Sequence, residues 1–248
     1  MIKLVEIEVN KIIKRSQTKI ILCILLTFYL MMVIFTKYFH SFDLNFVVEN
    51  SFSTLQFFPI ALIIFTTSSM AIEYQTGAIK TLIYNTEKRY KIIFSKLLAL
   101  IIVDLAMYLI ILIMNSLIIK FLFFKLVPFK VVKYSVLWIL GYVVESFYLI
   151  SLTFLLAIIF DNQAISVSIS IIVYFLANLI DGSIFSAIRN VNFLKYIPVN
   201  LFNFKMELVS QSMVNQTQLT VNNYVYLFVI YVCINVIFSI VVFSFKDL

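Results

Sequence analysis

The sequence is poor in the residues that most often build phosphate loops, disulfides and metal sites: it has 3 glycines, 2 cysteines and 1 histidine among 248 residues. No GxxxxGK[ST] motif occurs, which excludes ATP binding through a P-loop. Cys23 and Cys233 lie in apolar runs near opposite ends of the chain, which is typical of buried or lipid-facing thiols. His40 has no partner at ligand spacing. We therefore predict no catalytic residue, no metal and no cofactor bound by this chain.

Charge is also scarce. Charged residues make up 12% of the chain and hydrophobic residues 63%, with a mean hydropathy of +1.06. This composition exceeds the apolar content of soluble domains and predicts an integral membrane protein. The net charge of +7 comes from bases that flank the apolar runs. Their position favours phospholipid headgroups, and not nucleic acid, as the partner of these bases.

Apolar runs long enough to cross a bilayer occur six times. The predicted spans are 20–39, 52–72, 93–119, 135–160, 164–185 and 223–245. An even number places both termini on one side of the membrane. A modest excess of Lys and Arg on that side predicts cytoplasmic termini. We expect one all-α transmembrane domain over residues 1–248.

Two segments outside the spans are also expected to be helical. Within residues 1–19, apolar side chains recur at helical spacing beside five bases, which predicts an amphipathic helix on the inner leaflet. The run that follows lacks a signal-peptide cleavage site, so we interpret it as the first span. The first half of residues 182–222 is too short and too polar to span but too apolar to remain in water. We expect them to form a re-entrant outer segment of short helices.

The loop 73–96 is the chain's most charged connection between two spans. Because it must lie in water between two membrane helices, we expect it to contact another protein. Its bases could instead anchor the loop to anionic lipid. A second, very short polar connection, Asp161, Asn162 and Gln163, predicts a tight helical hairpin on the same face.

Several polar side chains fall inside predicted spans. Asp104 and Glu145 lie deep in the third and fourth spans, where a charge is costly and should face the bundle interior or water. Tyr108 is close to the face of Asp104, and Asn178 and Asp181 share a stripe of the fifth span. These residues either line a substrate pathway that attracts cationic groups or hold helices together by hydrogen bonds.

Together, the basic entry helix, six spans, charged loop, tight inner turn and re-entrant segment resemble the ABC-2-type permease subunits of bacterial ABC exporters. The loop motif carries this resemblance, and its residues are Glu73, Gly77, Lys80, Lys88, Arg89 and Lys96. The resemblance implies a coupling helix within 73–96 that docks on a separate ABC ATPase, with Asp161, Asn162 and Gln163 as a second contact. ATP and Mg would bind the ATPase alone.

The resemblance also implies a second permease copy, identical or related, and a location in the bacterial cytoplasmic membrane. The small size of the chain is similar to permeases of peptide exporters, such as those for phenol-soluble modulins or bacteriocin self-protection. The expected substrate is thus an amphipathic peptide or lipid-like molecule. Two alternatives stay open: a membrane scaffold or sensor that transports nothing, and an intramembrane enzyme that uses Asp104 and Glu145.

Overall fold

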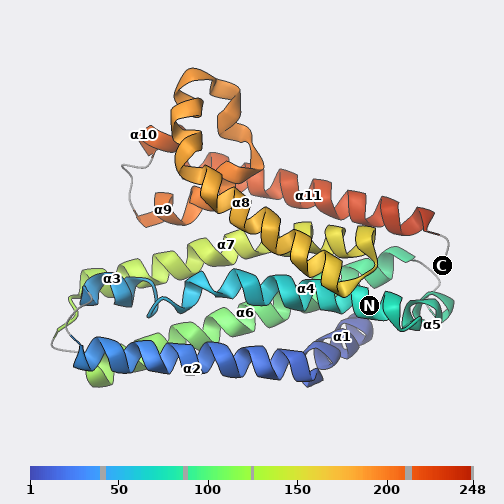
Figure 1. Cartoon of the computed structure of the whole chain (residues 1–248), viewed down its shortest axis with the longest axis horizontal. Helices are drawn as coiled ribbons and strands as arrows, with labels where there is room; N and C mark the ends of the chain where they lie inside the picture. The colour runs from blue at the N-terminus through green and yellow to red at the C-terminus, as the bar shows by residue number, and fades with distance from the viewer. Residues whose placement is uncertain (40–42, 86–88, 124–125, 210–213, 247–248) are drawn as a thin grey trace.

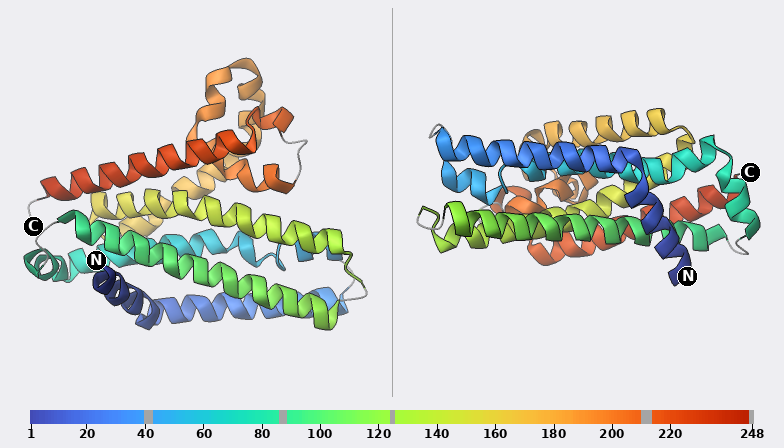
Figure 2. Two further views of the ribbon diagram at one scale, coloured as in Figure 1. Left: turned by 180° about the vertical axis from the view of Figure 1, so that it is seen from behind. Right: turned by 90° about the horizontal axis from the view of Figure 1, so that it is seen from below.

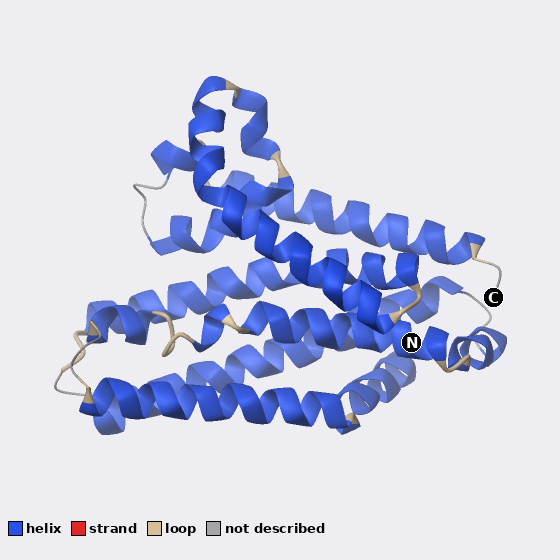
Figure 3. Ribbon diagram, viewed as in Figure 1, coloured by secondary structure: helices blue, strands red, loops and turns tan. Residues whose placement is uncertain are grey.

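The computed structural model describes residues 1–39, 43–85, 89–123, 126–209 and 214–246. These residues form helices and contain no strand (Figure 3). Among them, six helices are long and apolar enough to cross a membrane, which confirms the predicted all-α membrane fold. The six candidate spans are Ser16–Tyr38, Thr54–Gln75, Arg89–Leu122, Phe129–Phe160, Gln163–Ile180 and Val221–Phe245.

The long helices run side by side along the longest axis of the molecule (Figure 1). The N-terminus, α5 and the last turn of α11 lie at one end, which we call the termini end (Figures 1 and 2). The helices, in chain order, are α1 (Ile2–Lys14), α2 (Ser16–Tyr38), α3 (Leu44–Glu49), η1 (Thr54–Gln56), α4 (Phe58–Gln75), α5 (Ala78–Asn85), α6 (Arg89–Leu122), α7 (Phe129–Phe160), α8 (Gln163–Asn190), η2 (Asn192–Tyr196), η3 (Pro198–Asn203), α9 (Phe204–Val209), α10 (Val214–Thr217) and α11 (Val221–Phe245).

The span that contains α4 forms the centre of the bundle. In the most apolar 18 residues of this span, 72% are buried, whereas the corresponding share is 17% in α2 and in α11. The exposed leucines and isoleucines of these two outer helices are available to face lipid. Residues Thr66 to Ser69 of α4 are small and buried. The hydroxyls of Thr67, Ser68 and Ser69 bond within the helix, as when Thr67 Oγ1 donates to the Ile63 carbonyl over 2.7 Å. Small hydroxyl residues allow this close packing between membrane helices.

Several spans differ from their predicted bounds, including α7, which begins at Phe129 and not at residue 135. The helix α6 has 34 residues and is about 51 Å long, so it extends beyond a hydrocarbon core of about 30 Å. The predicted span 52–72 is not one helix from its first residue. Ser51, Phe52 and Ser53 have left-handed φ angles of 47°, 54° and 60°, and the regular helix begins after them. The sequence missed this turn because Phe52, which is fully buried, continues the apolar run.

The N-terminal segment forms a helix, as predicted. It packs beside the first turns of α6 and joins α2 through the extended residue Arg15 (Figure 2). The 182–222 segment contains short helices as expected, although α8 continues into it as far as Asn190. Buried side-chain bonds hold these short helices: Asn200 donates to the Lys195 carbonyl over 2.8 Å and accepts from the Tyr224 hydroxyl over 3.3 Å.

Candidate functional site

The short helix α5 presents a polar face at the termini end. Ile79 is buried on its inner side, and Leu82 and Ile83 pack against the same core. Lys80, Thr81 and Tyr84 are exposed, Tyr84 by 91%. A helix with one packed side and one open polar side is suited to receive a partner on the open side.

A glycine turn fixes α5 to α4. Gly77 has a φ angle of +71°, which side-chain-bearing residues rarely adopt. Its amide donates to the Tyr74 carbonyl over 3.2 Å, and its carbonyl accepts from the Lys80 amide over 3.1 Å. The turn therefore ends α4 and starts α5 within two residues. The predicted role of Gly77 as part of the loop motif thus has a geometric basis.

Behind α5 lies a four-charge cluster, formed by Glu8, Lys11, Glu73 and Lys96. The Lys96 ammonium lies 2.7 Å from the carboxylates of both Glu8 and Glu73, and it also donates to the Ser69 carbonyl over 3.1 Å. The Lys11 ammonium contacts the same two acids over 2.7 and 3.0 Å. The cluster joins α1, α4 and α6. Each acid lies between two bases, which is the arrangement that compensates for the loss of water around buried charge.

The electrostatics of the α1 members follow from this geometry. Burial raises the pKa of the Glu8 carboxyl, but the charge of Lys96 and the hydrogen bonds from Lys11 and Lys96 outweigh burial and place the pKa below its ordinary value. Burial lowers the pKa of the Lys11 ammonium, but Glu8 and Glu73 more than offset it and raise the pKa. Both groups are therefore ionised at neutral pH.

The cluster gives internal partners to Glu73 and Lys96, two residues of the predicted loop motif. They are only 4% and 1% exposed, so neither offers its charge to a partner at the surface. They hold α4 and α6 at the base of the loop instead. Sequence reasoning missed Glu8 and Lys11 as their partners. A signal was present, because Glu8 lies on the apolar stripe of α1 between Val5 and Ile12, where an acid needs a buried base.

Other predicted loop residues tie the termini end together. The Arg89 guanidinium donates to the carbonyls of Phe243, Ser244 and Lys246 over 3.3, 2.9 and 3.1 Å, and so caps the end of α11. The Lys246 ammonium contacts the Asp161 carboxylate in the turn between α7 and α8. Lys88 lies outside the described residues.

The α7–α8 turn is as tight as predicted, and its residues have internal partners. Asn162 caps α8 by accepting from the Ala164 amide over 2.9 Å. The Gln163 amide donates to Ser68 over 3.0 Å and to Gln17 over 3.2 Å. These bonds fix the turn to the start of α2 and to α4, which is also one of the three helices joined by the four-charge cluster.

Within the span region, Asp104 and Tyr108 bond α6 to α7. The Ser146 hydroxyl donates to the Asp104 carboxylate over 2.5 Å, and the Tyr108 hydroxyl donates to the Tyr142 carbonyl over 3.3 Å. Both residues are almost fully buried, at 0% and 2% exposure. These contacts are interhelical hydrogen bonds, of the kind expected if Asp104 and Tyr108 hold the helices together.

Glu145 and Asn178 lie in a different place. The Lys205 ammonium on α9 is 2.9 Å from the Glu145 carboxylate, and Lys205 lines a cavity of about 350 Å³ together with Asn178. The structure thus adds Lys205, a base of the predicted outer segment 182–222, to the pathway candidates. The side chain of Asp181 is outside the described residues. Ser146 and Glu145 are adjacent on α7 and point about 100° apart, so Asp104 and Glu145 face different neighbours.

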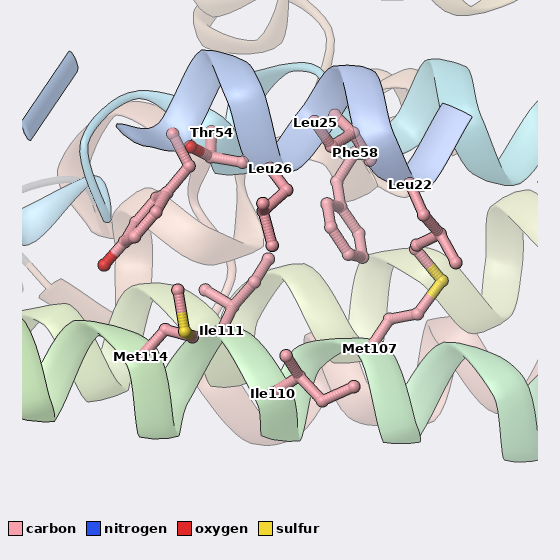
Figure 4. Close-up of a pocket in the computed structure, with 10 residues that line it drawn as sticks. Leu22, Leu25, Leu26, Thr54, Phe58, Met107, Ile110, Ile111 and Met114 are labelled. Carbon is pink, nitrogen blue, oxygen red and sulfur yellow. The ribbon is translucent and has the colours of Figure 1, made fainter. Parts of the chain in front are cut away.

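A second cavity is apolar. It has a volume of about 80 Å³ and lies where Leu22, Leu25 and Leu26 of α2 face α6 (Figure 4). From α6, Met107 and Met114 point toward it, with Phe58 of α4 between the two helices (Figure 4). Its hydrocarbon lining offers no charge for catalysis or for recognition of a polar group. The cavity shows that side chains do not completely fill the space between α2 and the neighbouring helices α4 and α6.

Comparison with known proteins gives a family match. Residues 20–248 match the family model described as "Protein of unknown function (DUF2705)". The match covers the six spans and the short helices of the 182–222 segment, and it begins after α1. No curated protein matches the chain.

Proposed function

The chain belongs to the DUF2705 family, and we propose that it is the membrane permease subunit of an ATP-driven exporter of the ABC-2 type. A separate ABC ATPase, carrying ATP and Mg, docks on the termini end, which faces the cytoplasm of a bacterial cell. A second permease copy completes the pathway. The cargo is an amphipathic molecule, most simply a peptide.

The observation that carries this proposal is the way α5 is mounted. Its open face, Lys80, Thr81 and Tyr84, is free for a partner, while its other side is packed on the core. The hydrogen-bonded turn at Gly77 joins α5 directly to α4, which belongs to the most buried span. A partner that pushes α5 therefore moves the centre of the bundle and not only a flexible loop.

The four-charge cluster supports the same reading. Glu73 is four residues before Gly77 and is bound to Lys96 of α6 and Lys11 of α1. A displacement at α5 is thus shared by three helices through short ionic contacts. Arg89 and Lys246 add ties to α11 and to the α7–α8 turn, so the termini end responds as one unit.

The test is co-purification of the chain in detergent with the ABC ATPase encoded beside it. Replacing the open face with the double variant Lys80→Glu/Tyr84→Ala should lower the amount of bound ATPase at least tenfold, because both side chains point away from the core. The control is Lys120→Glu, which makes the same charge change on an exposed residue far along α6. It should retain wild-type binding.

Two results would contradict the proposal. In the first, the wild-type chain purifies without an ATPase under conditions that preserve its fold. In the second, the α5 variant and the Lys120 variant bind the ATPase equally well. Either result would favour a scaffold or sensor.

A further inference from the structure

The Glu145 and Lys205 pair is built from the parts that recognise an organic ammonium. The Lys205 ammonium lies 2.9 Å from the Glu145 carboxylate and 4.7 Å from the centre of the Tyr142 ring. A carboxylate and an aromatic face are the two groups that bind ammonium ions most effectively when water is excluded. The side chains of Glu145 and Lys205 are only 2% and 8% exposed. The pair lies at the middle of α7, deep in the bundle.

The backbone beneath Lys205 is fixed by a close approach of α9 to α7. A Cβ atom added to Gly141 would lie 2.7 Å from the Cα atom of Lys205, nearer than two such atoms can approach. The two helices therefore touch at this point through their backbones. The side chain of Lys205 is the part that can move without separating α9 from α7.

A cavity lies beside the pair and is large enough for the apolar part of a small ligand. Its volume is about 350 Å³, at the lower end of the range of about 300–1,000 Å³ for small-molecule sites. Phe57, just before α4, Ile60 of α4 and Phe175 of α8 supply an apolar wall, and Tyr174 and Asn178 supply polar atoms. Lys205 itself forms part of the lining.

We propose that Glu145 and the Tyr142 ring form a binding site for the primary ammonium group of an amphipathic ligand, which Lys205 occupies until the ligand arrives. The ligand's ammonium replaces that of Lys205, and its apolar part fills the cavity. Lys205 turns aside while its backbone stays on Gly141. The proposal deepens the proposed function, on which it rests for the inference that the ligand is cargo.

The competition sets the class of ligand. A bare ammonium ion loses to Lys205, because the lysine is already tethered beside Glu145. A ligand with an alkyl or aromatic part gains about fourfold in affinity for each buried methylene. Amines with an apolar chain, including lysine side chains of amphipathic peptides, therefore fit the site. An anionic amphiphile attracted by Lys205 is the competing possibility, and the test separates the two.

The experiment measures binding of three six-carbon probes to the purified chain in a nonionic detergent, without any ATPase. The probes are n-hexylammonium, n-hexanol and hexanoate. Their binding is measured by the shift in the thermal unfolding temperature and by calorimetry. We expect n-hexylammonium to bind the wild type and the other two to bind at least tenfold more weakly. Lys205→Met removes the competitor but keeps the chain length, and should tighten n-hexylammonium binding at least tenfold.

The matched control is the double variant Lys205→Met/Glu145→Gln, which removes both charges of the pair. It should lose the preference for n-hexylammonium over n-hexanol. Preferred binding of hexanoate that Lys205→Met abolishes would overturn the proposal in favour of an anion site. Equal binding of all three probes to the wild type would also overturn it. Both results are independent of ATPase co-purification, so the two proposals can fail separately.

Discussion

At the scale of single residues, the structure places charge where the sequence alone would exclude it. Lys96 has no exposed side-chain area, yet it is bonded to two carboxylates and a carbonyl. Removing one partner from such a group costs about 3–5 kcal/mol, because the other charge stays buried. The position of each charge in the cluster is therefore as constrained as that of an apolar core residue.

The lowered pKa of Glu8 makes the stability of the cluster depend on pH. An acid whose folded-state pKa lies below its ordinary value of 4.5 stabilises the fold above that value and loses this contribution as the pH falls through the folded-state pKa. We expect the wild type to be more stable than Glu8→Gln at pH 7. The difference in their unfolding temperatures should shrink as the pH is lowered below 4.5. A difference that stays constant from pH 7 to pH 3 would show that Glu8 is not ionised in the folded protein.

At the scale of elements, two glycines connect helices for opposite reasons. Gly77 is needed for its positive φ, and a Cβ there would meet open space. Gly141 is needed for its missing side chain, because α9 lies directly against it. The same substitutions at the two positions should therefore have different effects.

Substitution of Gly77 and of Gly141 by alanine and by asparagine distinguishes the need for a positive φ from the need for a missing side chain. At Gly77, Ala should cost about 1–2 kcal/mol through the left-handed backbone, and Asn should cost less because it tolerates that conformation. At Gly141, Ala should cost about 1–3 kcal/mol by overpacking, and the larger Asn should cost more. Denaturant or thermal unfolding in detergent gives the four values. The same order of Ala and Asn at both sites would refute the distinction.

The elements also show what the sequence could predict. Apolar run length located the six spans because the bilayer imposes that length locally. The local pattern of α1 indicates that Glu8 needs a buried base, but it does not identify Lys96, which is far away in sequence. Lys205 was missed for the same reason: the sequence places it in the outer segment 182–222, outside the spans, whereas the fold brings α9 back against α7.

At the scale of the whole molecule, the described spans put α1 and α5 at one end and the α6–α7 connection at the other. If the termini end is cytoplasmic, single cysteines should report it in a variant that lacks Cys23 and Cys233. Cysteine at the exposed positions Lys3 or Tyr84 should react with a membrane-impermeant thiol reagent only after the cells are opened. Cysteine at Leu126 should react in intact cells. The reverse pattern would invert the topology and remove the ATPase docking site from the cytoplasm.

The four-charge cluster has one more consequence, for the voltage across the membrane. Its two acids and two bases sum to zero when all four are ionised. The cluster itself therefore carries no net charge through the transmembrane field, which acts at about 2.3 kcal/mol per charge for each 100 mV, when it moves as a unit. Any voltage dependence of a movement of α1, α4 and α6 must come from other charged residues of these helices, such as Asp104 in α6.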